Sequence, residues 1–183
     1  MKSLSGALLG LLTHGLALLT LTAAGMASDW PQFRGVNGSG ISPDTTPLPD
    51  QWSETKNLQW KVDLPGPGHS CPIVVGDKVF VTCWSGYGTS RTDAGSQEKL
   101  ERHLVCVDRK SGKILWSKSV KASLPEDRYG GMFAENGYAS HTPVSDGKRM
   151  SATAWAIGVG VRRRARFFTT TSSSCRPRRR ATR

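Results

Sequence analysis

Two histidines and four cysteines are the residues whose types are best suited to metal binding or catalysis in this sequence. His69 and His141 each lie shortly before a proline that opens a predicted strand, so they can line the shared mouth of a ligand-binding fold. The sequence offers no third metal ligand and no carboxylate partner to accompany these two histidines, so both are expected to be loop residues. The cysteines include no C-x-x-C pair, and therefore no zinc pattern. They occur at positions 71, 83, 106 and 175.

The other polar clusters also have simpler explanations than catalysis. Gly66-Pro67-Gly68 lacks the Gly-Lys-Ser/Thr that completes a phosphate-binding loop. Ser145 and Lys148 match S-x-x-K, but they fall in a predicted hairpin turn. Residues 126–128 are expected to form a solvated loop, and His103 is expected on the surface of a sheet. We therefore predict no enzymatic activity, no catalytic or metal-binding residue and no cofactor.

The first 27 residues have the features of a secretory signal peptide. Lys2 gives a positive start, residues 8–21 are mostly Leu, Ala and Gly, and small residues at Gly25 and Ala27 mark a cut after Ala27. The alternative is an uncleaved membrane anchor. In both cases the rest of the chain is expected to be exported, to the periplasm, the cell envelope or the exterior. No later stretch is apolar enough to span a bilayer, so no stable span is expected after cleavage.

Export bears on the state of the cysteines. Cys71, Cys83 and Cys106 all lie in apolar, strand-like runs. An oxidising compartment permits a disulfide, and Cys71 and Cys83 can approach each other across a hairpin. We favour free, buried thiols, because cysteine packs well as a small apolar residue.

Alternating and β-branched runs follow an irregular leader at 28–56. Residues 57–64 alternate apolar and polar side chains and predict one strand. Residues 71–83 hold two β-branched runs around Gly76-Asp77, which predicts a hairpin. Two more strands are expected at 100–107 and 114–120. Because no segment after the signal peptide has a helical period, the sequence predicts an all-β protein.

A second copy of this pattern starts further along the chain. Residues 140–150, SHTPVSDGKRM, are similar to residues 69–80, HSCPIVVGDKVF, with Pro143 answering Pro72. Units of four antiparallel strands in series are typical of β-propeller blades. We therefore expect a partial β-propeller over 57–149, with one four-stranded blade and the start of a second.

The segment CVDRKSGKILW resembles the blade motif of the pyrroloquinoline-quinone-like (PQQ-like) β-propeller repeat family, Ala-x-Asp-x-x-Thr-Gly-x-x-x-Trp. Asp108, Gly112 and Trp116 occupy the motif positions, with Cys106 in place of Ala and Ser111 in place of Thr. The leader DWPQFRG and the run from WKVDLPGPGHS onward are similar to exported members. The resemblance implies that the tryptophan docks onto the neighbouring blade and that the glycine lets the chains approach.

This resemblance also implies a function. The expected role is that of a binding or scaffold module with a protein partner in the cell envelope. The alternative is a remnant of a PQQ-dependent quinoprotein dehydrogenase, the branch in which a vicinal cysteine pair, a calcium ion and acidic residues grip the quinone. This sequence has no vicinal cysteine pair, and the repeat motif alone does not carry the activity.

The composition changes near residue 150. The formal net charge is +11, but residues 1–148 hold 15 Lys and Arg against 14 Asp and Glu, whereas residues 149–183 hold ten Arg and no acid. GC-rich codons translated out of frame give such a composition. Translation in the shifted reading frame permits the sequence WGSAASPVLYDDLVIV, which has the pattern of a blade hairpin. We therefore predict a disordered, out-of-frame tail over 150–183. The alternative is a genuine basic tail that binds nucleic acid or anionic lipid; for an exported chain no nucleic-acid partner is expected.

The signal-peptide prediction has a direct test. Because the apolar stretch is followed by Gly25 and Ala27, the chain made in an exporting host should begin at Ser28 after processing. N-terminal sequencing of the exported protein measures this, and an intact Met1 would contradict it.

Overall fold

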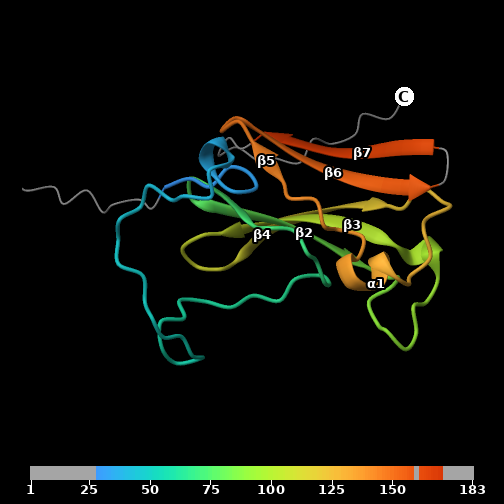
Figure 1. Cartoon of the computed structure of the whole chain (residues 1–183), viewed down its shortest axis with the longest axis horizontal. Helices are drawn as coiled ribbons and strands as arrows, with labels where there is room; N and C mark the ends of the chain where they lie inside the picture. The colour runs from blue at the N-terminus through green and yellow to red at the C-terminus, as the bar shows by residue number, and fades with distance from the viewer. Residues whose placement is uncertain (1–27, 159–160, 171–183) are drawn as a thin grey trace, which may run out of the picture.

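The computed structural model describes residues 28–158 and 161–170, which form an all-β protein of two antiparallel sheets (Figure 1). The predicted signal peptide at 1–27 with its cleavage site, the end of the tail at 171–183 and Cys175 lie outside the described residues. The all-β prediction from the sequence is confirmed.

The first sheet contains the four strands that the hairpin signals predict, in chain order. Its strands are β1 (Ile73–Val75), β2 (Lys78–Ser85), β3 (Glu101–Asp108) and β4 (Ile114–Lys121). The tight turn at Gly76-Asp77 joins β1 to β2 and sets a register in which Val75 lies opposite Lys78. A loop joins β2 to β3 and contains one turn of 3-10 helix at Gln97–Lys99.

The second sheet contains β5 (Val144–Ser145), β6 (Arg149–Gly158) and β7 (Val161–Thr170). The prediction of a disordered tail from residue 150 is therefore wrong for most of 150–170, where β6 and β7 pair in one continuous register. The physical reason lies at the start of β6, where Met150 and Ala152 are 0% and 2% exposed and belong to the core. Burial of these two side chains anchors the hairpin.

Helices are short in the described part of the chain. Beside the turn at Gln97–Lys99, they are a 3-10 turn at Val36–Gly38 and α1 (Met132–Asn136). None of the described helices has the length and apolar character needed to cross a membrane.

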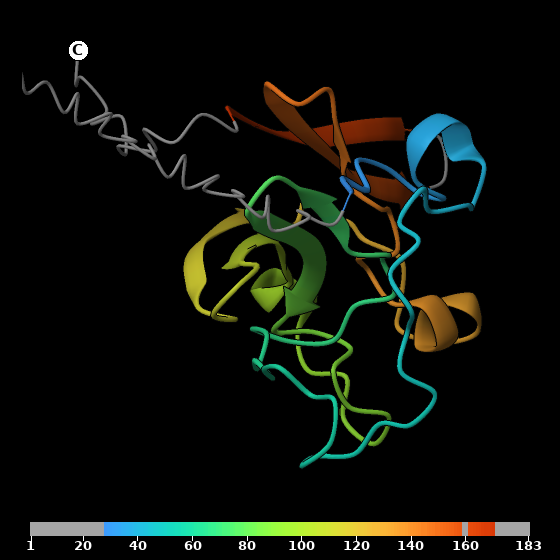
Figure 2. The same ribbon diagram turned by 90° about the vertical axis from the view of Figure 1, so that its left-hand side faces the viewer.

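Alternate residues of β3 point to opposite faces of the first sheet, and both sets are buried. Leu104 and Cys106 enter one core cluster, whose other buried members are Ile73, Phe80, Met150 and Ala152. Val105 and Val107 enter a second cluster with Cys83 on the opposite face. Figures 1 and 2 show the second sheet lying along one side of the first sheet.

The prediction of a strand at 57–64 is wrong, although its alternation is meaningful. This segment runs as extended chain outside any strand. Trp60, Val62 and Leu64 pack against the buried cluster of Cys83, Val105 and Val107. The Trp60 Nε1 donates a hydrogen bond of 2.9 Å to the Arg109 carbonyl. The segment is therefore held through its side chains, and no described strand lies beside it as a ladder partner.

The start of the leader ties the two sheets together. The backbone of Trp30 forms two hydrogen bonds with Val74, of 2.8 and 2.9 Å. The next residue, Pro31, accepts a hydrogen bond of 2.8 Å from the Ser145 N–H in β5. The Asp29 Oδ1 accepts one of 2.7 Å from the Gly76 N–H. These residues, 29–31, act as a strap that crosses from one sheet to the other.

None of Cys71, Cys83 and Cys106 forms a disulfide within the described residues. Cys83 and Cys106 are buried in the two clusters, as predicted, and burial raises the pKa of the Cys83 thiol. Cys71 is exposed, so the expectation of burial is wrong for it. Cys71 lies two residues before β1, which begins at the buried Ile73.

Two glycines with positive φ provide a matched test of close packing. Gly112 has φ +72°, and a Cβ there would lie 2.6 Å from the Trp60 ring; Gly76 has φ +57° and open space around it. We expect Gly76→Ala to lower the free energy of unfolding by about 1 kcal/mol through backbone strain. Gly112→Ala should cost about 2 kcal/mol more, because Trp60 must move. Urea titration measures both, and equal losses would contradict the packing role of Gly112.

Candidate functional site at the junction of the two sheets

The motif residues Asp108 and Gly112 shape the turn between β3 and β4. The Asp108 Oδ1 accepts hydrogen bonds from the Ser111 N–H (2.7 Å) and the Ser111 hydroxyl (2.6 Å). These bonds to Ser111 hold the pKa of Asp108 below its ordinary value. The Gly112 N–H donates to the Asp108 carbonyl at 2.9 Å, and the absence of a side chain at Gly112 leaves room for the Trp60 ring.

The third motif residue, Trp116, faces the junction between the sheets. It lies opposite Cys106 in the β3–β4 register, and its ring is 5.9 Å from that of Phe80, tilted by 52°. Trp116 packs against the cluster that includes Met150 and Ala152 of β6. The motif residues therefore contribute to packing on both faces of the first sheet. Gly112 leaves room for Trp60 on one face, and Trp116 packs between the two sheets on the other.

The two stretches that precede β1 and β5 lie side by side. The His69 N–H donates to the Ala139 carbonyl at 3.2 Å, and the Cys71 N–H donates to the Thr142 hydroxyl at 3.1 Å. The Thr82 hydroxyl, on β2, donates to the His141 carbonyl at 3.1 Å. These residues, 69–71 and 139–142, form what we call the seam.

Both seam histidines are exposed. The His69 ring stacks on Trp84 at 6.0 Å, and partial desolvation of the His141 ring, followed by the positive charge of Arg102, lowers the pKa of His141. Among the described residues, no three His, Cys, Asp or Glu side chains are grouped to hold a metal ion. The contacts of the seam are hydrogen bonds and the stacking of His69 on Trp84.

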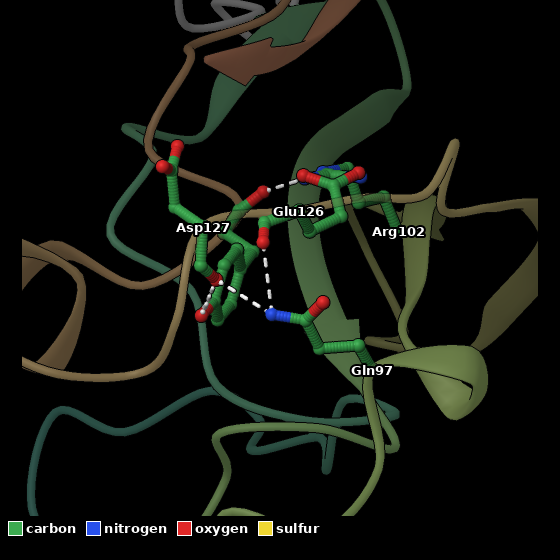
Figure 3. A network of polar contacts seen from close by, with 5 residues as sticks. Gln97, Arg102, Glu126 and Asp127 are labelled. Carbon is green, nitrogen blue, oxygen red and sulfur yellow. Dashed lines mark hydrogen bonds and ion pairs between the residues drawn. The ribbon is translucent and has the colours of Figure 1, made fainter. Parts of the chain in front are cut away.

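A buried ion pair fixes the connection between β4 and β5 at the end of the first sheet (Figure 3). Arg102 binds Glu126 through its two terminal guanidinium nitrogens, at 2.8 and 2.9 Å. Its Nε donates to the Tyr138 carbonyl at 3.0 Å. The side chains of Arg102 and Glu126 are only 7% and 2% exposed. The prediction of a solvated loop at 126–128 is therefore wrong for Glu126.

Further contacts complete this network. The Gln97 Nε2 donates to the carbonyls of Glu126 (2.9 Å) and Asp127 (3.2 Å). The Tyr138 hydroxyl donates to the Asp127 carbonyl at 2.8 Å. An aromatic cluster surrounds these bonds, and its members are Trp84, Tyr87, Tyr129, Phe133 and Tyr138. The connection is thus an ordered part of the fold that leads directly into the seam.

His103 is the second polar residue that the structure places differently from expectation. The sequence predicts it on the sheet surface, but it is only 8% exposed. Its Nε2 lies 2.7 Å from the Ser85 hydroxyl on the neighbouring strand. Burial lowers the pKa of His103. The reason is that His103 follows the same alternation as Val105 and Val107, the face covered by residues 60–64.

The alternation could have located the ion pair as well. Arg102 shares the face of Leu104 and Cys106, which the pattern of β3 directs inward. A charged residue at an inward position requires a buried partner of opposite charge. Nothing in the sequence identifies that partner as Glu126, which is 24 residues away in an irregular connection.

Comparison of the chain with protein-family profiles, with curated proteins and with solved structures finds no match to any of the three.

The ion pair generates a prediction about stability. Arg102→Met should lower the free energy of unfolding by about 3–5 kcal/mol, because it leaves the Glu126 carboxylate buried and unpaired. Glu126→Leu should have a similar effect, and the double variant should lose less than the two single losses added together. Chemical denaturation of all four proteins measures this.

The exposed pair Lys61–Glu54, at 3.8 Å, is the control. Lys61→Met should change the stability by less than about 1 kcal/mol. Additive losses at Arg102 and Glu126 would show that the pair does not act as a unit.

His103 generates a prediction about pH. Because its pKa is lowered in the folded chain, the unfolded chain binds the proton first as the pH falls. Stability should therefore decrease below the ordinary histidine pKa of about 6.5 until the folded-state pKa is passed. Thermal unfolding across this range should show a smaller decrease for His103→Gln. An unchanged slope in this variant would assign the dependence to other groups.

Proposed function

We propose that this chain is a blade-bearing segment of an exported PQQ-like β-propeller that acts as a binding or scaffold module for a protein partner in the cell envelope. One observation carries the proposal: the four-stranded sheet has two apolar faces, and segments from different parts of the chain cover them. A sheet in a radial array must be covered on both faces, because it stacks between two neighbours.

The motif residues support this proposal through their positions. Trp116 packs at the junction with the second sheet, and Gly112 admits Trp60 on the other face. In the complete propeller, the extended chain at 58–64 would then pair as an outer strand with the last blade, which closes the ring of blades. That role accounts for a segment that has strand-like alternation without a ladder.

The seam supports a binding role at the inner edge of the two sheets. Two similar sequences precede the first strands of the two sheets, HSCP before β1 and SHTP before β5. Hydrogen bonds join these two stretches to each other. In the proposed propeller these stretches would surround the central axis, where such folds take their ligands. The groups exposed there include two histidines and the Cys71 thiol, which suit polar contacts with a partner.

Sequencing of the locus tests the propeller. The coding DNA, read in the shifted frame across residues 154–176, should encode a hairpin of Leu and β-branched residues. Further copies of Asp-x-x-Thr/Ser-Gly-x-x-x-Trp should follow at blade-length spacing. Early stop codons, or the lack of any further copy, would contradict the proposal and favour a genuine basic tail.

Calorimetry separates the scaffold from the dehydrogenase. The full-length product of the corrected frame should bind neither pyrroloquinoline quinone nor calcium. Stoichiometric quinone binding would overturn the scaffold role while leaving the propeller intact.

A further inference from the structure

The chain contains two Asn-Gly pairs, and the structure treats them very differently. Asn37-Gly38 lies in the leader, and Asn136-Gly137 ends α1. This dipeptide is prone to loss of the asparagine amide, because glycine leaves its own backbone nitrogen sterically free to attack. We propose that Asn37 is a site of spontaneous deamidation in the folded protein and that Asn136 is protected.

The reaction at Asn37 needs no partner except water. The Gly38 backbone nitrogen forms a bond to the Asn37 Cγ, the side-chain amide takes the proton, and ammonia leaves. Water then opens the resulting five-membered imide at one of its two carbonyls. The products are aspartate, or an isoaspartate that carries the main chain through the side-chain carbon. No oxidation or reduction takes place.

Around Asn37 little opposes this attack. Asn37 is exposed, and no residue of the turn at Val36–Gly38 is buried. The space around Gly38 is open. The Gly38 nitrogen is held only by a hydrogen bond of 3.1 Å to the Gly35 carbonyl. Because no residue of this turn is buried, its opening belongs to the low-cost local motions of the chain.

At Asn136 the same attack is blocked in three ways. The Asn136 Nδ2 donates to the Met132 carbonyl at 3.2 Å, and the Gly137 N–H donates to the Phe133 carbonyl at 3.0 Å. Gly137 is buried directly against the Trp84 ring. Freeing its nitrogen would require α1 to unwind and the aromatic cluster to separate, which costs far more than opening an exposed turn.

The proposal is tested on the full chain, incubated at mildly alkaline pH and analysed by peptide mapping with mass spectrometry. Asn37 should be lost at least about tenfold faster than Asn136 in buffer, because the two sites differ in the free energy of local opening. In urea the two rates should become similar. Equal rates in buffer, or faster loss at Asn136, would overturn the proposal.

Two variants provide controls. Asn37→Gln should abolish the change at residue 37 and leave the rate at Asn136 unaltered. Trp84→Ala should accelerate loss at Asn136 alone, since it removes the ring that covers Gly137. If this variant does not fold, the comparison of the two sites in the unaltered chain still decides the matter.

Discussion

Burial of β3 on both faces is the constraint on which the rest of the structure depends. Leu104 and Val105 are neighbours that point to opposite sides, and each is 0% exposed. A single sheet cannot bury both, so two other layers must cover it. The chain supplies one layer from residues 60–64 and the other from the second sheet. The strap at 29–31 then joins the first strands of the two sheets.

A second constraint follows from the same alternation. It directs Arg102 toward the inside, where a guanidinium is tolerated only with an opposite charge and hydrogen-bond acceptors. Glu126 and the Tyr138 carbonyl provide them. The connection that carries both residues is thereby fixed across the end of the sheet, although it contains no regular element except α1. Its position in turn decides where residues 139–142 begin the seam.

Local signals predicted the first sheet well, because short turns join β1 to β2 and β3 to β4. Gly76-Asp77 and the turn from Asp108 each specify their own hairpin, and the alternation of β3 marks both of its faces. What could not be predicted depends on partners far apart in sequence. Alternation at 57–64 indicates a buried side but cannot reveal that no strand pairs there. Glu126 lies in an irregular connection, and nothing in the sequence reveals that it is buried against Arg102, 24 residues away. Composition alone led to the wrong prediction of disorder at β6, since Met150 and Ala152 are core residues in a segment that otherwise lacks strand signals.

The two histidine-bearing stretches are similar in sequence and lie side by side in the structure. HSCP and SHTP occupy equivalent places before β1 and β5, and hydrogen bonds join them directly at the Cys71 N–H and the Thr142 hydroxyl. Adjacent units of a stacked repeat make such contacts because each one repeats the path of its neighbour. If each further unit placed a stretch of this kind beside the last, successive seams would lie along one common edge. In the proposed propeller that edge surrounds the axis, so a partner bound there would contact every unit through the same few polar positions.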